Sequence, residues 1–475
     1  MKRKLLSFMT VLASTLGIGN PAAAQRISDN AVFYHSFRSP WNNELNPAHF
    51  PGQSGWYFTT SKASVAMELP VSYNDLGLRY DPVEDVTILD VNHLIDHLYE
   101  NGFHLNNTND ANLLGFGFSV KERFQMSFSA GLRTMVNTSI PLGLLKMLTH
   151  GNLNNEGHLD FGGSEIVSTQ AYAYASASAA LKLPIVPLTI GGRFKLLDGI
   201  AAVSLDNLMV DLVTAEDVSM MQLHTNYLVH TAGLIQGVDM DFSSLRFNDV
   251  LEQLKSFANL GYTFDLGAKF SLGPLDLSMS IVDLGPGIKW RNSPQLWKPK
   301  EQEITITFDG VDLSALMSGG TINTDFFEQW GDSLMNLIDY TTEACEYWYS
   351  IPTSMYAGAS ISAGKLLRAG YLFQGQWANG WINRNHGGEN HFCCNNTLSA
   401  HLNLGNWLEL SVANSFTYDG NHLTWLNPGA ALTLSLGRTT QFFAALDYAS
   451  SMYLTEVRSA HVTAGVNIVH FRKEK

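Results

Sequence analysis

Apolar and polar residues alternate strictly in short segments that recur along the chain up to its C-terminus. In residues 124–133 and 275–281, every second residue is apolar and the residues between are mostly small or polar. A period of two is typical of β-strands with two unlike faces. Strands of this kind predict a β-barrel in an outer membrane, with lipid outside and water or polar packing inside.

The N-terminus has the features of an export signal. A basic Met1-Lys2-Arg3-Lys4 precedes an uncharged run from Leu5 to Gln25, in which three alanines come directly before Gln25. This pattern predicts a signal peptide over residues 1–24, cleaved between Ala24 and Gln25. An uncleaved membrane anchor is the alternative, but polar residues, Gly and Pro interrupt the run, which is short for a membrane span of ~20 apolar residues.

Composition favours a membrane barrel and argues against nucleic acid as a partner. Charged residues make up 15% of the chain, against ~25% in typical soluble domains. Aromatic residues reach 11%, and no later segment has ~18 consecutive apolar residues. A secreted array of β-sandwiches would fit these values too. The formal net charge is −14, and the chain beyond the signal peptide lacks the Lys and Arg clusters that phosphate binding requires.

The chain divides into an irregular N-terminal segment and a long β-rich region. Residues 25–55 are polar and contain three prolines, which predicts either a plug or a flexible lead-in to the first strand. Residues 56–475 form the predicted barrel. Helical spacing near residues 90–102, 246–257 and 324–348 predicts insertions, which must lie in loops or in the lumen because the lipid-facing backbone has to pair within the wall.

The last third of the chain distinguishes the barrel from the sandwich. Strands are predicted, in order, over residues 353–364, 366–378, 395–404, 407–417, 425–436, 440–449 and 459–471. Their connections alternate between tight turns and longer loops, as periplasmic turns and outer loops do in bacterial barrels. The prediction is therefore an all-β, antiparallel transmembrane barrel, with a mature length that suits 12–16 strands of ~10 residues.

Several motifs resemble a known group of outer-membrane barrels. Asn46-Pro47-Ala48, before the first strand, resembles a motif of the fatty-acid-transporter (FadL) barrels and their secretion-associated PorV relatives. The stretch from Gly261 to Trp290, with its Asp-Leu-Gly-Ala and Asp-Leu-Gly segments, looks like an uncharacterised family related to that group. The resemblance implies about 14 strands, an N-terminal segment inside the lumen and no catalytic residues.

Charged residues on the predicted strands are expected to point into the lumen. Asp265, Lys269, Asp276 and Glu409 alternate with apolar neighbours, and a Lys or Arg on the lipid face costs ~2–4 kcal/mol near the membrane midplane. Two interpretations stay open. The charges form either a selective polar lumen or a structural network. In such a network, Asp265 and Lys269 would pair with each other or with groups of a plug.

The three cysteines, Cys345, Cys393 and Cys394, form no disulfide framework. A disulfide from Cys345 to Cys393 or Cys394 is favoured over metal binding, since both loops are predicted on the outer side and the His and Cys residues of 385–394 lack a standard ligand spacing. We expect no metal and no cofactor.

Two functions are predicted for an integral protein in the outer membrane of a Gram-negative bacterium, with its lipid as a partner. The first is passive transport of a small solute, including a hydrophobic one, past the N-terminal segment. The second is a non-transporting scaffold for components of a secretion or surface-assembly system. The chain has no Gly-x-Ser-x-Gly setting and its histidines are scattered, so we expect no enzyme.

Overall fold

The structure is a computed structural model. It describes residues 30–49, 55–81, 86–89, 93–94, 97–98, 103–120, 123–140, 158–160, 163–214, 220–235, 247–300, 303–307, 340–377, 379–381, 392–405, 407–418, 423–437 and 439–471. The predicted cleavage site at Ala24 and Gln25 lies outside these residues. So do most of the predicted insertion at 90–102 and the insertion at 324–348 up to residue 339.

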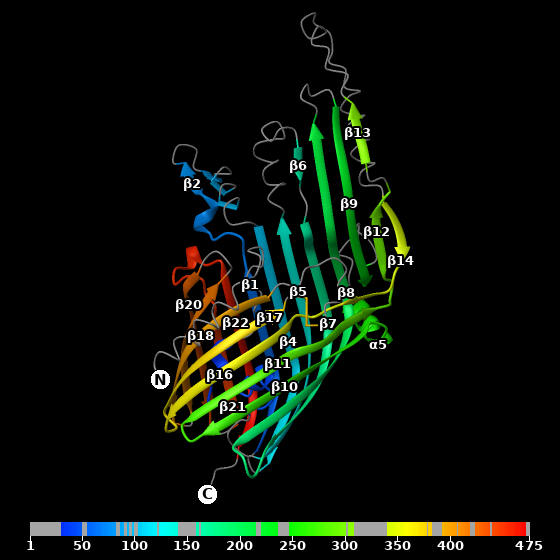
Figure 1. The fold of residues 1–475 in the computed structure, drawn as a ribbon. Helices are drawn as coiled ribbons and strands as arrows, with labels where there is room; N and C mark the ends of the chain where they lie inside the picture. The colour runs from blue at the N-terminus through cyan, green and yellow to red at the C-terminus, as the bar shows by residue number, and fades with distance from the viewer. Residues whose placement is uncertain are drawn as a thin grey trace, which may run out of the picture.

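Fourteen strands form a closed antiparallel barrel, in which each strand pairs with the next and β22 pairs back with β1 (Figure 1). In order around the wall they are β1 (Gly55–Glu68), β4 (Phe103–Val120), β5 (Phe124–Ile140), β7 (Gly163–Lys182), β8 (Leu188–Thr214), β10 (Leu260–Leu272), β11 (Leu275–Trp290), β16 (Thr353–Ala363), β17 (Leu367–Trp377), β18 (Phe392–Leu404), β19 (Leu408–Tyr418), β20 (Leu423–Leu436), β21 (Thr440–Asp447) and β22 (Ser459–Phe471). The predicted fold class and strand number are confirmed.

One side of the wall continues beyond the barrel, at the end opposite the C-terminus (Figure 1). There β9 pairs with the second half of β8, residues 201–214, whereas β10 pairs with the first half, residues 188–198. The strands of this extension are β6 (His158–Asp160), β9 (Met220–Gly233), β12 (Gln295–Pro299), β13 (Glu303–Thr307), β14 (Tyr340–Ala344) and β15 (Tyr347–Tyr349). A separate hairpin joins β2 (Leu78–Asp81) to β3 (Val86–Leu89).

In the described part of the chain, the helices are short. They are η1 (Ala31–Phe33), α2 (Asn42–Leu45), η2 (Asn74–Leu76), α5 (Phe247–Ser256) and η5 (Leu454–Glu456). In the part of the chain described here, none is long and apolar enough to cross a membrane. α5 lies within the second predicted insertion. The helical expectation for 324–348 is wrong at its C-terminal end, where β14 pairs with β12 and β15 with β11, because strand pairing overrides a helical spacing.

The two faces of the wall differ as the alternation predicts. In β10, Phe264 and Leu266 are 44% and 55% exposed on the outer face, whereas Asp265 between them is fully buried inside. Apolar side chains face outward in the same way on the other wall strands. This gives the barrel an apolar exterior suited to lipid and a polar interior.

Tight turns join several strand pairs at the end of the barrel that holds the end of β22. Gly273, between β10 and β11, and Gly364, between β16 and β17, adopt left-handed backbone angles with φ of +59° and +64°. Other residues rarely adopt these angles, so glycine suits both positions. β1 also starts at this end of the barrel, because its first residue pairs with the last residue of β22.

Candidate functional site

Residues 30–49 lie inside the barrel and form a plug. Nearly all of them are buried, including Tyr34, Asn46 and Ala48. The plug is built from η1 and the single turn of α2, which ends at Asn46 in an extended conformation. This ending is expected, because the residue before a proline is disfavoured in the helical region. Of the two alternatives for the N-terminal segment, the structure shows the plug.

Two buried carboxylates of the wall bind backbone amides of the plug. Asp447 of β21 accepts the N–H of Val32 at 2.7 Å. Glu409 of β19 accepts the N–H of Phe37 at 2.9 Å and the hydroxyl of Ser36 at 3.0 Å. Hydrogen bonds to a charged acceptor are about twice as strong as neutral ones. These contacts therefore hold the first half of the plug against β19 and β21.

The Asn46-Pro47-Ala48 motif joins the plug to β10 and β11. The Asn46 amide donates to the carbonyl oxygens of Met279 at 3.2 Å and Ala268 at 3.4 Å, and to the Tyr34 hydroxyl at 3.2 Å. Its own oxygen accepts the N–H of Ala48 at 2.9 Å. The tripeptide is thus a structural connection between plug and wall.

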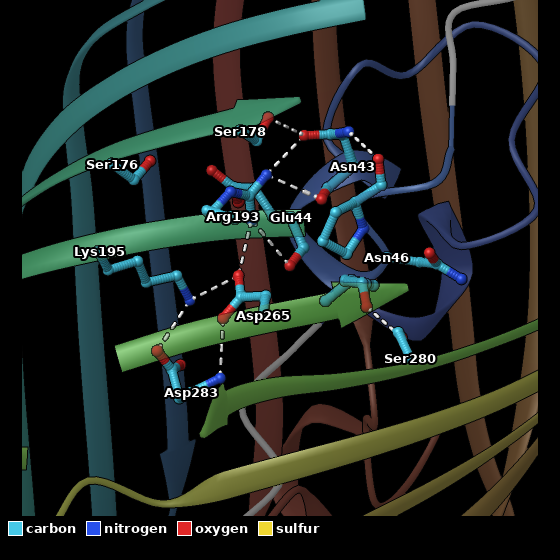
Figure 2. A network of polar contacts seen from close by, with 12 residues as sticks. Asn43, Glu44, Asn46, Ser176, Ser178, Arg193, Lys195, Asp265, Ser280 and Asp283 are labelled. Carbon is cyan, nitrogen blue, oxygen red and sulfur yellow. Dashed lines mark hydrogen bonds and ion pairs between the residues drawn. The ribbon is translucent and has the colours of Figure 1, made fainter. Parts of the chain in front are cut away.

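Arg193 of β8 is the centre of a polar network between plug and wall (Figure 2). Its guanidinium donates to the backbone oxygen of Asn43 at 2.8 Å, to that of Glu44 at 3.2 Å, and to Asp265 at 3.2 Å. Because Arg193 and Asp265 are both buried, the pair depends on these hydrogen bonds.

The network continues away from the plug along the wall. Lys195 lies 3.1 Å from Asp265 and 2.8 Å from Asp283, and the N–H of Asp283 donates to Asp265 at 2.9 Å. Beyond it, Arg133 of β5 contacts Asp110 at 2.6 Å. The lumen therefore contains alternating charges that are paired with one another.

A cavity of about 70 Å³ lies between the plug and this network. Its lining comes from the plug and from β1, β4, β5, β7, β8, β11 and β22. One part is aromatic, with Phe33, Trp41 and Tyr172, and the rest is mostly polar or charged. Lys62 of β1 borders the cavity, 4.5 Å from the Trp41 ring centroid and in an ion pair with Glu44.

Two plug histidines are buried in neutral form. Burial, followed by the positive charge that His401 would carry, lowers the pKa of His35 to about 3. Burial and nearby Lys269 place the pKa of His49 well below its ordinary value of 6.5. Protonation of either histidine would therefore oppose docking of the plug.

The four lumen-facing candidates lie inside the barrel but serve separate contacts. Asp265 belongs to the Arg193 network, and Glu409 holds the plug. Lys269 pairs with Asp276 at 2.9 Å instead of with Asp265. The structure thus brings Asp265 and Glu409 to the plug and places the Lys269–Asp276 pair apart from that network.

Several important residues were missed from the sequence. Arg193, Lys195 and Asp283 supply most of the network, and Asp447 binds the plug. Arg193 and Lys195 alternate with Phe194 and Leu196, which are 42% and 40% exposed on the outer face. That alternation was the available signal.

The predicted disulfide is absent, since none of Cys345, Cys393 and Cys394 forms a disulfide bond in the structure. Cys345 lies between β14 and β15. β15 and β16 both pair with β11, so they follow one another along one line, or column, of the sheet. Cys393 and Cys394 are the second and third residues of β18, in another column. β17 separates the columns, so the lateral distance is roughly 10 Å, beyond the ~7 Å that a disulfide spans. Among the described residues, no three His, Cys, Asp or Glu side chains gather to hold a metal.

A family model, "Family of unknown function (DUF5723)", matches residues 47–447 of the chain. This match confirms the predicted membership of an uncharacterised family. Among curated proteins, no relative matches.

Solved structures with a similar fold include barrels of the FadL type. The Pseudomonas putida toluene transporter TodX is 7% identical, with 90% of this chain and 93% of that chain covered and a TM-score of 0.40. A Pseudomonas aeruginosa FadL homologue is 10% identical, with coverage of 96% and 98% and a TM-score of 0.41. The CymD monoaromatic hydrocarbon channel is 9% identical, with coverage of 97% and 98% and a TM-score of 0.40.

Proposed function

The chain belongs to the family of unknown function DUF5723, and we propose that it is an outer-membrane channel through which a small solute crosses passively, with the plug as its gate. In a closed barrel, the backbone N–H and C=O groups of every wall strand can form hydrogen bonds within the sheet, and the apolar exterior suits a bilayer. The export signal predicted at the N-terminus agrees with an outer membrane. The proposed role is transport rather than catalysis.

The observation that carries the proposal is the cavity between the plug and the wall. Ser127 and Ser178, which each lie 3.4 Å from the Asn43 side chain, are closer to the tight turns than Ser129 and Arg133, which line the cavity. The cavity therefore lies on the side of the plug away from the tight turns. A solute that reaches it has the plug between itself and the far end of the lumen.

The contacts of the plug suit a gate. They include hydrogen bonds and ion pairs to the wall, which water can replace when the plug moves. Apolar packing adds to them, with Phe33 against Phe443 and Tyr34 against Tyr356. The aromatic lining at Phe33, Trp41 and Tyr172 offers a surface for the apolar part of a solute. We therefore propose a solute that is small and partly apolar.

The test is ion conductance of the refolded protein in a planar lipid bilayer. The double variant Glu409→Gln/Asp447→Asn weakens charge-assisted hydrogen bonds to the plug, each of which contributes about 1.5–3 kcal/mol. We expect rare openings in the original protein and at least tenfold more open time in the variant. Asp276→Asn is the matched control, because Asp276 pairs with Lys269 in the lumen. Silence of both proteins, with the barrel correctly folded, would contradict the channel.

The second candidate is a docking scaffold. The extension formed by β9, β12, β13 and β14 rises beyond the barrel on one side only, where it could contact a partner on the outer side (Figure 1). A scaffold needs no plug movement. Silent conductance together with capture of secretion-system components through this extension would favour it over the channel.

A further inference from the structure

We infer that the outer loop between β21 and β22 regulates the plug, and that Tyr448 is the residue that connects the two. This inference rests on the proposed channel function and concerns the regulation of its gate. It is carried by the backbone conformation of Tyr448, by the contacts that hold this conformation, and by the hydrogen bond between the neighbouring Asp447 and the plug.

Residues 448–458 form the loop that joins β21 to β22, at the end of the barrel opposite the tight turns. The loop reaches the surface there, since Tyr453 near its tip is 70% exposed. Tyr448, the first residue of the loop, is 3% exposed and belongs to one buried apolar cluster with Ala31 and Tyr34 of the plug. One short segment therefore extends from the outer surface to the plug.

The backbone of Tyr448 is strained. Its φ of +51° lies in the left-handed region, which residues with bulky side chains rarely adopt. Such a conformation persists only where the surrounding structure holds it in place. When one of the holding contacts is lost, we expect the backbone of Tyr448 to move to an ordinary conformation. Tyr448 is therefore suited to be a hinge with two discrete states.

The contacts that hold Tyr448 come from the barrel interior and from the outer loop. In the interior, its ring packs in the cluster with the plug, and its hydroxyl donates to the Gln374 side chain of β17. On the loop side, its carbonyl oxygen accepts the hydroxyl of Ser459, the first residue of β22, at 3.1 Å. The conformation of Tyr448 thus depends on both the plug and the base of the loop.

The position of Ser459 is fixed from the outer side of the barrel. The Ser450 hydroxyl accepts the N–H of Ser459 at 3.1 Å and that of Arg458 at 2.7 Å, which ties the two ends of the loop together. The Arg458 guanidinium donates to Asp75 of η2 at 2.9 Å, and the Arg458 side chain is 38% exposed. A change at the outer surface that moves Arg458 therefore also moves Ser459, the next residue.

The residue before Tyr448 binds the plug. Asp447 accepts the N–H of Val32 on Oδ2 at 2.7 Å and the N–H of Tyr448 on Oδ1 at 3.2 Å. The carboxylate is closely enclosed, because a Cβ atom at Gly429 would lie 2.5 Å from Oδ1. A change in the Tyr448 backbone withdraws its N–H from Oδ1 and shifts the carboxylate away from Val32. Tyr448 is therefore a positioning residue, which acts on the plug through Asp447.

The test compares Ser459→Ala with Ser451→Ala in the refolded full-length protein. Ser459→Ala removes the hydroxyl that holds the Tyr448 carbonyl oxygen. Ser451 is the matched control, because its hydroxyl bonds within the loop, to Glu456 at 2.9 Å and to the N–H of Tyr453 at 3.1 Å. The measurements are the rate of proteolytic cleavage of the plug in detergent and the open time in a planar lipid bilayer. Heat-modifiable gel mobility shows that each barrel has folded.

We expect Ser459→Ala to increase both plug cleavage and open time about threefold, the effect of one hydrogen bond between neutral groups. The cleavage rate follows the population of released plug when release and docking are fast. Ser451→Ala should change neither quantity. Equal effects of the two variants, or no effect of Ser459→Ala on plug cleavage, would overturn the inference.

A second comparison separates an effect through Asp447 from a general loosening of β22. Asp447→Ala removes the acceptor of the Val32 N–H. In that background, Ser459→Ala should increase cleavage of the plug by less than about 1.5-fold, because the contact on which it acts is already gone. The same threefold increase in both backgrounds would show that Ser459 does not act through Asp447.

The two proposals fail separately. Faster plug cleavage in Ser459→Ala, without conductance in any variant, would keep the coupling and remove the channel. Conductance, with equal plug cleavage in the original protein and Ser459→Ala, would keep the channel and remove the coupling.

Discussion

Gly191 of β8 and Pro47 of the plug are in direct contact through their backbones. A Cβ atom at position 191 would lie 2.7 Å from the backbone nitrogen of Ala48 and closer still to the Pro47 carbonyl group. Contacts of this kind cannot be relieved by rotating a side chain. The wall therefore accepts the Asn46-Pro47-Ala48 segment only because residue 191 has no side chain.

We expect Gly191→Ala to displace the plug while the barrel still folds. Gly192→Ala is the matched control, because its Cβ would meet nothing closer than 3.7 Å. The measurement is limited proteolysis in detergent, with heat-modifiable gel mobility as the test of barrel folding. The plug should become cleavable in Gly191→Ala alone. Equal protection of the plug in both variants would show that the contact does not control docking.

Arg193→Met should be strongly destabilising. It leaves Asp265 with Lys195 as its remaining cation and removes the donors to Asn43 and Glu44. Breaking one side of a buried ion pair costs about 3–5 kcal/mol. Unfolding of the refolded protein in urea measures this loss. The exposed Lys298–Glu343 pair gives the control, since Lys298→Met should cost less than about 1 kcal/mol.

The double variant Arg193→Met/Asp265→Asn separates an uncompensated charge from lost packing. Removing the Asp265 charge should recover part of the stability that Arg193→Met loses. The asparagine is neutral, so the double variant has no buried carboxylate that lacks its guanidinium partner. If the two losses simply add, the interaction between these residues is not the main source of the destabilisation.

The three cysteines should react as free thiols. Maleimide labelling of the unfolded protein should modify Cys345, Cys393 and Cys394 without prior reduction, and a reducing agent should not increase the number of labelled sites. Mass spectrometry counts the modifications. One label before reduction and three after it would demonstrate a disulfide and contradict the separation of these columns in the sheet.

The sequence was sufficient for the wall but not for the contacts inside it. Alternation around Asp265 predicted its inward orientation, because the side-chain period of a strand is a local property. It did not predict that Asp265 would pair with Arg193, since that pairing depends on the register between β8 and β10. For the same reason, Lys269 pairs with Asp276 across the β10–β11 turn.

The plug could be located from sequence but its contacts could not. Three prolines and a polar composition marked residues 25–55 as irregular. The partners of this segment, such as Asp447 and Glu409, come from the far end of the chain, and no local pattern connects them. The prediction of a disulfide was wrong for a related reason, because two loops on the same side of a barrel can still be separated by a strand.

Acid should weaken docking of the plug through His35. Its pKa in the docked plug is about 3, because of burial and then of His401, against 6.5 when exposed. A released imidazole therefore binds a proton between these values, whereas the docked one does not. Docking is at full strength above pH 6.5 and weakens as the pH falls toward 3, by at most about 1.4 kcal/mol per pH unit for this residue. Proteolytic accessibility of the plug, measured across this range, reports the change.

The informative variant for this pH dependence is His35→Gln, which does not titrate and still has a donor for the Tyr371 carbonyl oxygen, 3.1 Å from the His35 ring. It should flatten the dependence without abolishing it, because the pKa of His49 is also lowered. The comparison is between slopes, so a uniform change in docking strength does not affect it. An unchanged slope in His35→Gln would assign the acid sensitivity to other groups, with the wall carboxylates that bind the plug as the next to test.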